Sequence, residues 1–126
     1  MREHLIQTAV MAVLNSRESP CRVWRNNVGG YYDARGVYVS YGLAKGSADL
    51  IGLVQVTITP EMVGRTVALF LSDEIKAAKG RLSPEQEAWE RTMGKLHAVH
   101  QLHRSEEEAR EFLRKVKDGC LFSEAA

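Results

Sequence analysis

The sequence predicts an α/β fold in which helices flank a mixed central β-sheet. Three observations lead to this prediction. Apolar residues recur with helical spacing near the N-terminus, while short apolar or alternating runs in the middle of the chain are typical of strands. Two helix start signals follow, at Ser83 and Ser105, with a further strand-like run between them. The 126 residues are enough for one compact domain with a single core, spanning positions 1–126.

The first third of the chain predicts one helix and a hairpin. Residues 2–15 place apolar side chains at a spacing that gives a helix one wide apolar face. Residues 21–27 then form a short strand-like run, which Gly29 and Gly30 interrupt. Residues 36–41 alternate between apolar and polar positions, a pattern typical of a second strand. We expect this second strand to pair with the first as a hairpin.

The middle of the chain predicts two further strands. Residues 43–48 include a glycine and form a turn. Residues 49–58 follow as a third strand, which is apolar enough to be central in the sheet. After a second turn, residues 66–77 give the longest strand of the chain.

Two helices with clear start signals close the chain. Ser83 is followed by Pro84 and, three residues later, by Gln86, which together give an N-cap, a proline at the first helical position and a capping-box partner. Ser105 is followed by three glutamates, which suit the positive end of a helix dipole. Residues 97–102 lie between these helices and read as a short strand.

Composition excludes some classes of protein. The chain has 17 basic and 16 acidic residues, so its total charge neither indicates nor excludes a nucleic-acid partner. No apolar run approaches the roughly 18 residues of a membrane span, and the polar N-terminus is unlike a signal peptide. Cys21 and Cys120 lack the spacing of a metal or disulfide framework. We therefore expect a cytoplasmic protein with no membrane partner.

An acid and a base stand two residues apart near the end of the longest predicted strand. Alternate residues of a strand share a face, so Glu74 and Lys76 point the same way, roughly 7 Å apart along the strand. An isolated pair of this kind is typical of a surface ion pair on an edge strand. Two such groups can also converge on one small functional site if further polar groups lie beside them.

Asp49 adds a second carboxylate at the head of the predicted central strand. Alone, an acid at this position is a turn-former or a cap. Beside the carboxylate and ammonium of Glu74 and Lys76, it makes a specific set. Its oxygen ligands suit Mg²⁺ or Mn²⁺ rather than zinc. Lysine is suited to holding a water or a phosphate oxygen.

Several stretches together resemble the VRR-NUC domain, a nuclease family of the PD-(D/E)XK superfamily. The matching segments are GSADL, the strand ending EIK, and KGRLSPEQ. WRNNVGGYY and YGLAKGSADLIG also resemble the compact stand-alone members found in phages and prophages. The resemblance covers most of the chain. It implies a restriction-endonuclease-like core and a Mg²⁺- or Mn²⁺-dependent DNA endonuclease formed by a single VRR-NUC domain.

The resemblance also implies roles for individual residues. Asp49 and Glu74 would be metal ligands, with the backbone carbonyl of Ile75 beside them. Lys76 would position or activate the attacking water. Ala48 stands where the family motif usually has proline, which removes backbone stiffness and no functional group.

Three other positions keep two interpretations open. Gln86 matches a glutamine near the family's site, but it also suits the capping box, and one side chain need not serve both. Glu3 matches an acid that completes the metal shell in related nucleases, and it is equally a solvent-facing residue of a first helical turn. Asp73 falls on the strand face expected to pack against a helix, where an unpaired carboxylate is costly. It is either an additional acid near the metal or a destabilising substitution.

Basic and polar residues flank the proposed site in the sequence. Each alone is typical of a solvated surface, whereas together they suit contacts to a phosphate backbone that carry no base recognition. The helix beginning at Ser83 also offers its N-terminal amides to phosphate. The candidate nucleic-acid-binding residues are Arg25, Asn26, Lys45, Lys79 and Arg81.

The function expected from this reading is hydrolysis of phosphodiester bonds in branched DNA. Compact family members resemble dimeric Holliday-junction resolvases, and a two-fold symmetric dimer matches a four-way junction. The expectation is therefore a homodimer, in the host cytoplasm if the chain is phage-encoded. The alternatives are a flap or single-strand nuclease, and a nucleic-acid-binding protein that has the nuclease fold without activity.

Overall fold

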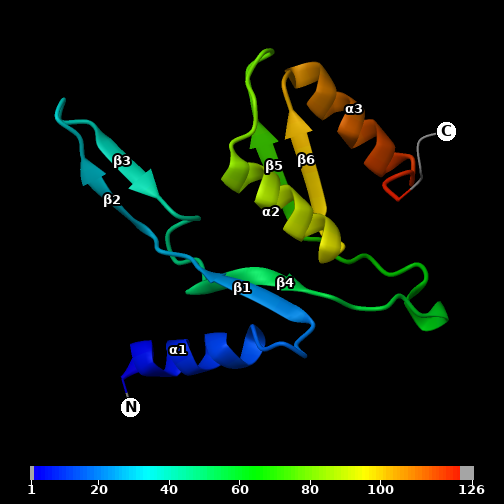
Figure 1. Ribbon diagram of the computed structural model, residues 1–126, viewed down its shortest axis with the longest axis horizontal. Helices are drawn as coiled ribbons and strands as arrows, with labels where there is room; N and C mark the ends of the chain where they lie inside the picture. Colours follow the sequence, from blue (N-terminus) through cyan, green and yellow to red (C-terminus); the bar gives the residue numbers. More distant parts are fainter. Residues whose placement is uncertain (1, 123–126) are drawn as a thin grey trace. The chain divides into compact units, whose positions relative to one another are not determined.

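The computed structural model describes residues 2–122, and they form two compact units that meet in the chain between Ala68 and Leu69. Figure 1 shows the elements of both units. In the first they are α1 (Glu3–Leu14), β1 (Cys21–Arg25), β2 (Gly29–Tyr32), β3 (Tyr38–Tyr41), β4 (Leu50–Val54) and the short 3₁₀ helix η1 (Pro60–Met62). In the second they are β5 (Leu71–Ile75), α2 (Pro84–Lys95), β6 (Val99–His103) and α3 (Glu106–Lys117). The predicted α/β class is confirmed.

The strands of the described chain pair two by two. β1 pairs with β4 and β2 pairs with β3, both antiparallel, while β5 and β6 are parallel. The expected hairpin between residues 21–27 and 36–41 is therefore wrong. The two glycines that seemed to interrupt a strand instead begin β2, which is the true partner of β3.

Glycine allows the close packing within the β2–β3 hairpin. A Cβ atom at Gly30 would collide with the hydroxyl of Tyr38, and one at Gly29 would collide with that of Tyr41. The tyrosine rings thus occupy the space that side chains at these positions would fill.

The hairpin turn is held by hydrogen bonds to the carboxylate of Asp33. The backbone amide of Val37 and the guanidinium and backbone amide of Arg35 donate these bonds, which hold the pKa of the Asp33 carboxyl below the ordinary value of 3.8.

β5 is much shorter than the strand predicted over residues 66–77, and it is not uniquely the longest. It has 5 residues, as β1, β4 and β6 do. Its partner limits it, because β6 begins just after the end of α2 and ends just before the cap of α3. His97 lies between α2 and β6 with a φ of 61°, which turns the chain sharply. A ladder cannot extend beyond the shorter strand that supplies its hydrogen bonds.

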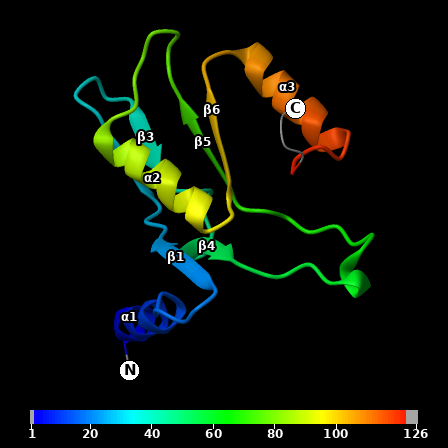
Figure 2. The same ribbon diagram turned by 45° about the vertical axis from the view of Figure 1, so that its right-hand side comes forward.

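In the second unit, α2 and α3 cover opposite faces of the β5–β6 pair (Figures 1 and 2). The indole of Trp89 in α2 donates to Ser72 on one face, and the ring of Phe112 in α3 lies 5.8 Å from that of His103 on the other. Met93 of α2 is fully buried. Both helix starts are as predicted, with a complete capping box at Ser83 and a serine cap at Ser105.

Among residues 2–122 there is no helix with both the length and the apolar character needed to cross a lipid bilayer. Cys21 and Cys120 are both free thiols, the first half-buried and the second exposed.

Candidate functional site

Glu74 and Lys76 lie on the same face of the strand segment that ends β5. Exposure alternates along this segment, with Ser72, Glu74 and Lys76 more covered than the residues between them. The side chains of Glu74 and Lys76 are 27% and 22% exposed, and Lys76 Nζ lies 3.8 Å from Glu74 Oε1. The predicted shared face is therefore confirmed, and the pair is half-buried rather than a fully solvated surface ion pair.

Gln86 joins this pair from the first turn of α2. Its Oε1 accepts a hydrogen bond from the Ser83 amide at 2.9 Å, which is half of the capping box. Its Nε2 donates to Glu74 Oε1 at 2.8 Å. One end of the amide completes the capping box and the other contacts Glu74, so a capping role and a position beside Glu74 are compatible. The helix cap sets the position of the glutamine, and the glutamine sets the position of the carboxylate.

A second set of polar groups lies next to Glu74 on the same strand face. Trp89 Nε1 donates to Ser72 Oγ at 3.2 Å, and Ser72 Oγ is also hydrogen-bonded to His100 Nδ1 at 2.5 Å. His100 belongs to β6, Trp89 to α2 and Ser72 to β5, so these hydrogen bonds link the three elements that surround this strand face. It gives the strand that carries Glu74 a defined position.

Asp73 has a partner on the opposite face. His103 Nδ1 donates to Asp73 Oδ2 at 2.6 Å, and the imidazole is 8% exposed against 32% for the carboxylate. The pair explains the acid that sequence reasoning left without a role, because a buried ring nitrogen needs a hydrogen-bond partner. The signal for it was the three-residue spacing of the last three histidines, which places His100 and His103 on opposite faces of β6.

In the first unit, Asn26 organises the turn that leads to Asp49. Its Nδ2 donates to Ser47 Oγ at 2.7 Å and to the Ala48 carbonyl at 2.9 Å, and its Oδ1 accepts from the Leu43 amide at 3.1 Å. Its backbone amide donates to the Asp49 carbonyl at 2.8 Å. Asn26, predicted as a phosphate contact, thus uses its side chain to hold the turn before Asp49. Asp49 itself is exposed.

The remaining predicted residues are distributed over both units. Glu3 lies exposed in the first turn of α1, and Arg25 and Lys45 are also exposed in the first unit. Ile75 ends β5, and Lys79 and Arg81 are exposed in the loop that follows. The set that the structure brings together by side-chain contact is Glu74, Lys76 and Gln86.

The donors available for a cation are hard oxygen atoms. Within residues 2–122, no three His, Cys, Asp or Glu side chains gather as a metal-binding group. Glu74 supplies one carboxylate to its cluster, and the lysine and glutamine beside it are not ligands of the usual type for Mg²⁺. The Glu74 site fits an oxygen-binding cation only with carboxylate or backbone oxygen from other positions.

Comparison with protein-family models, with curated proteins and with solved structures gives no match for this chain.

Proposed function

We propose that the chain is a metal-dependent DNA endonuclease of the VRR-NUC type, which hydrolyses phosphodiester bonds in branched DNA. In this proposal the fold is restriction-endonuclease-like, and Asp49 and Glu74 are ligands of Mg²⁺ or Mn²⁺, with the Ile75 carbonyl beside them. The observation that carries the proposal is the contact set of Glu74, Lys76 and Gln86. A hydrogen bond that fixes a carboxylate is a common feature around metal-binding carboxylates, and Gln86 supplies one to Glu74.

The residues of this set have separable tasks. Gln86 donates a hydrogen bond to Glu74 Oε1, which restricts the orientation of the carboxylate. Lys76 carries a charge beside the carboxylate, where it orients a water and stabilises negative charge that develops on the phosphate. A bound divalent ion supplies Lewis acidity to the phosphate and a lowered pKa to a bound water.

The decisive test is loss of cleavage with retention of binding. We expect Glu74→Gln and Asp49→Ala each to reduce Mn²⁺-dependent cleavage by roughly a thousand-fold, because metal charge stabilisation is worth several kcal/mol and about 1.4 kcal/mol is tenfold. DNA affinity measured without divalent ions should change little. Glu87→Gln, at an exposed position one residue beyond Gln86, is the matched control. Metal-dependent cleavage by both site variants at the control's rate would exclude the proposed site.

The substrate we propose is a four-way junction, cut by a homodimer. The junction has two-fold symmetry, so two identical sites can act on opposing strands. A parallel assay of a four-way junction, a flap and a plain duplex of equal length tests this preference. Preferential cutting of the flap would assign the chain to the flap nucleases. If a calorimetric titration with Mn²⁺ detects no binding, the inactive nucleic-acid-binding alternative is favoured.

A further inference from the structure

Arg104 gathers three backbone carbonyls of the loop that follows Lys76. Its Nη1 donates to the carbonyls of Ala77 at 2.7 Å, Ala78 at 3.3 Å and Gly80 at 2.7 Å. The arginine is half-buried and directly follows β6. A guanidinium used in this way makes charge-assisted hydrogen bonds, which are about twice as strong as neutral ones. The loop is therefore held by a side chain that lies 24 or more positions away in the sequence.

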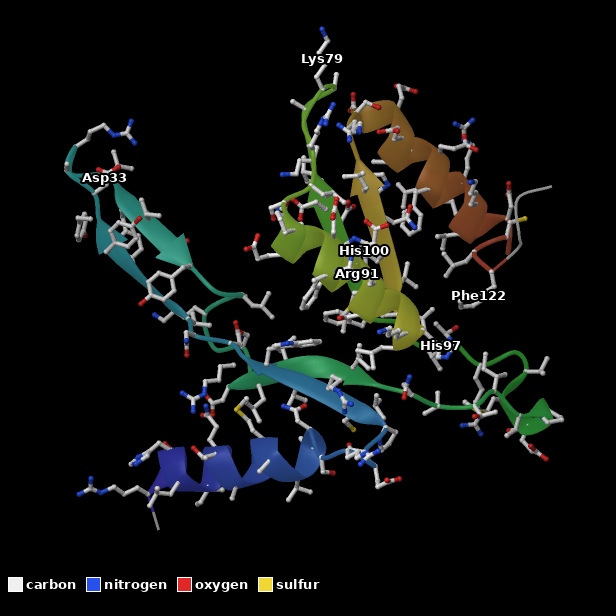
Figure 3. The ribbon with its side chains drawn as sticks, in the orientation of Figure 1. Asp33, Lys79, Arg91, His97, His100 and Phe122 are labelled. Carbon is white, nitrogen blue, oxygen red and sulfur yellow. The ribbon has the colours of Figure 1, made fainter. Side chains whose placement is uncertain are left out.

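The loop itself forms a turn with Lys79 near its tip. The Gly80 amide donates to the Ala77 carbonyl at 3.0 Å and closes the turn. The carbonyls of this segment face Arg104, while the Lys79 side chain points away from the end of the loop (Figure 3). Carbonyl oxygens repel a phosphate, so their inward orientation leaves the ammonium group as the outward charge of the turn.

Arg104 is itself held in place by the start of α3. Its backbone amide donates to Glu108 Oε1 at 2.5 Å, and Ser105 Oγ accepts from the Glu108 amide at 3.2 Å. The preceding residue, His103, accepts the Lys76 amide through its carbonyl at 3.1 Å. Residues 103 and 104 thus hold the two ends of one segment, from the lysine of the candidate site to the closing glycine of the turn.

We propose that Arg104 is a positioning residue that fixes this turn so that Lys79 contacts a DNA phosphate next to the candidate site. The inference rests on the proposed function, which supplies the DNA substrate. It assigns the phosphate contact to Lys79 and an indirect part to Arg104. It differs from a role in which Arg104 contacts phosphate directly, because the slope losses of Arg104 and Lys79 variants would then add.

The salt dependence of DNA binding separates these roles. Each phosphate contact contributes about 0.9 to the slope of log affinity against log salt concentration. We expect Lys79→Met and Arg104→Met each to lower the slope for a four-way junction, measured without divalent ions, by about 0.9. The double variant should lose about 0.9 and not twice that value, because both changes remove one contact. Arg114→Met removes an exposed arginine paired with Glu111 in α3 and is the matched control, with an unchanged slope.

Amide hydrogen exchange of the free protein provides a readout that does not depend on DNA. Arg104→Met should speed exchange of the Gly80 amide about tenfold or more, whereas Lys79→Met should leave it slow. Additive slope losses in the double variant, or an unchanged slope in Arg104→Met, would overturn the proposal. If Arg104→Met does not fold, Arg104→Lys replaces it, and fast Gly80 exchange with the slope of the unmodified protein overturns the proposal equally.

Binding and cleavage of the same four-way junction in the presence of Mn²⁺ distinguish failure of the proposed nuclease function from failure of the proposed Arg104 role. An unmodified protein that binds the junction without cutting it counts against the nuclease alone and leaves the salt analysis valid. An unmodified protein that does not bind DNA overturns both proposals.

Discussion

At the scale of single residues, Gln86 links the stability of α2 to the candidate chemistry. Gln86→Ala removes the hydrogen bonds to the Ser83 amide and to Glu74. We expect a loss of about 1–2 kcal/mol in the free energy of unfolding, since each hydrogen bond contributes about 0.5–1.5 kcal/mol. Cleavage should also fall, because the carboxylate loses its orientation. Urea denaturation and the cleavage assay measure the two effects.

Ser83→Ala is the matched control for this prediction. It removes the serine cap, worth about 1 kcal/mol, but leaves the hydrogen bond between Gln86 and Glu74. It should therefore destabilise the protein to a similar extent and keep its cleavage rate. Equal loss of cleavage in the two variants would show that helix stability, and not carboxylate orientation, controls the site.

At the scale of elements, two glycines distinguish close packing from open space. A Cβ atom at Gly52 in β4 would collide with the Arg22 carbonyl of β1, whereas Gly94 in α2 has no neighbour within 4 Å of that position. We expect Gly52→Ala to destabilise the β1–β4 pair by about 1–3 kcal/mol through overpacking. Gly94→Ala should stabilise α2 by up to about 1 kcal/mol, because alanine restricts the unfolded chain. Thermal unfolding of both variants checks the opposite signs, and a stabilising Gly52→Ala would contradict the observed register.

The elements also show how far sequence reasoning reaches. The helix starts at Ser83 and Ser105 were predictable because capping is local, within three residues of each serine. The partners of β1 and β3 were not, because pairing depends on contacts between segments distant in the chain. In the candidate site, the shared face of Glu74 and Lys76 follows from strand periodicity alone. The spacing of the last three histidines places His100 and His103 on opposite strand faces, but it does not identify Asp73, 30 positions away, as a partner. The arginine that holds the turn after Lys76 is 24 positions from Gly80, and no local pattern signals it.

At the scale of the whole molecule, the described chain leaves much apolar surface uncovered. Met93 is the one buried hydrophobic side chain among residues 2–122, and it belongs to the second unit. Leu5 and Val13 of α1 are 52% and 69% exposed. Apolar surface of this kind marks sites of association. The proposed homodimer would cover faces of this kind.

The proposed homodimer makes a direct prediction about mass. We expect light scattering at micromolar concentration to give about twice the chain mass of 14.1 kDa. Leu5→Glu and Val13→Glu should shift the protein toward the single-chain mass if α1 takes part in the interface, because a charge is costly to bury. Arg35→Glu, at an exposed turn of the β2–β3 hairpin, is a control for added negative charge. A single-chain mass for a preparation that cuts junctions would contradict the dimer.

The indole of Trp89 gives the candidate site an optical reporter of its own. It lies one turn of α2 beyond Gln86 and donates to Ser72, the residue two positions before Glu74 on the same strand face. The chain has two tryptophans, and the other, Trp24, is in β1. A Trp24→Phe protein would therefore keep one indole, whose emission can be excited at wavelengths that tyrosine does not absorb. Titration with Mn²⁺, a paramagnetic quencher, would lower this emission if the ion binds at the proposed site, without a DNA substrate.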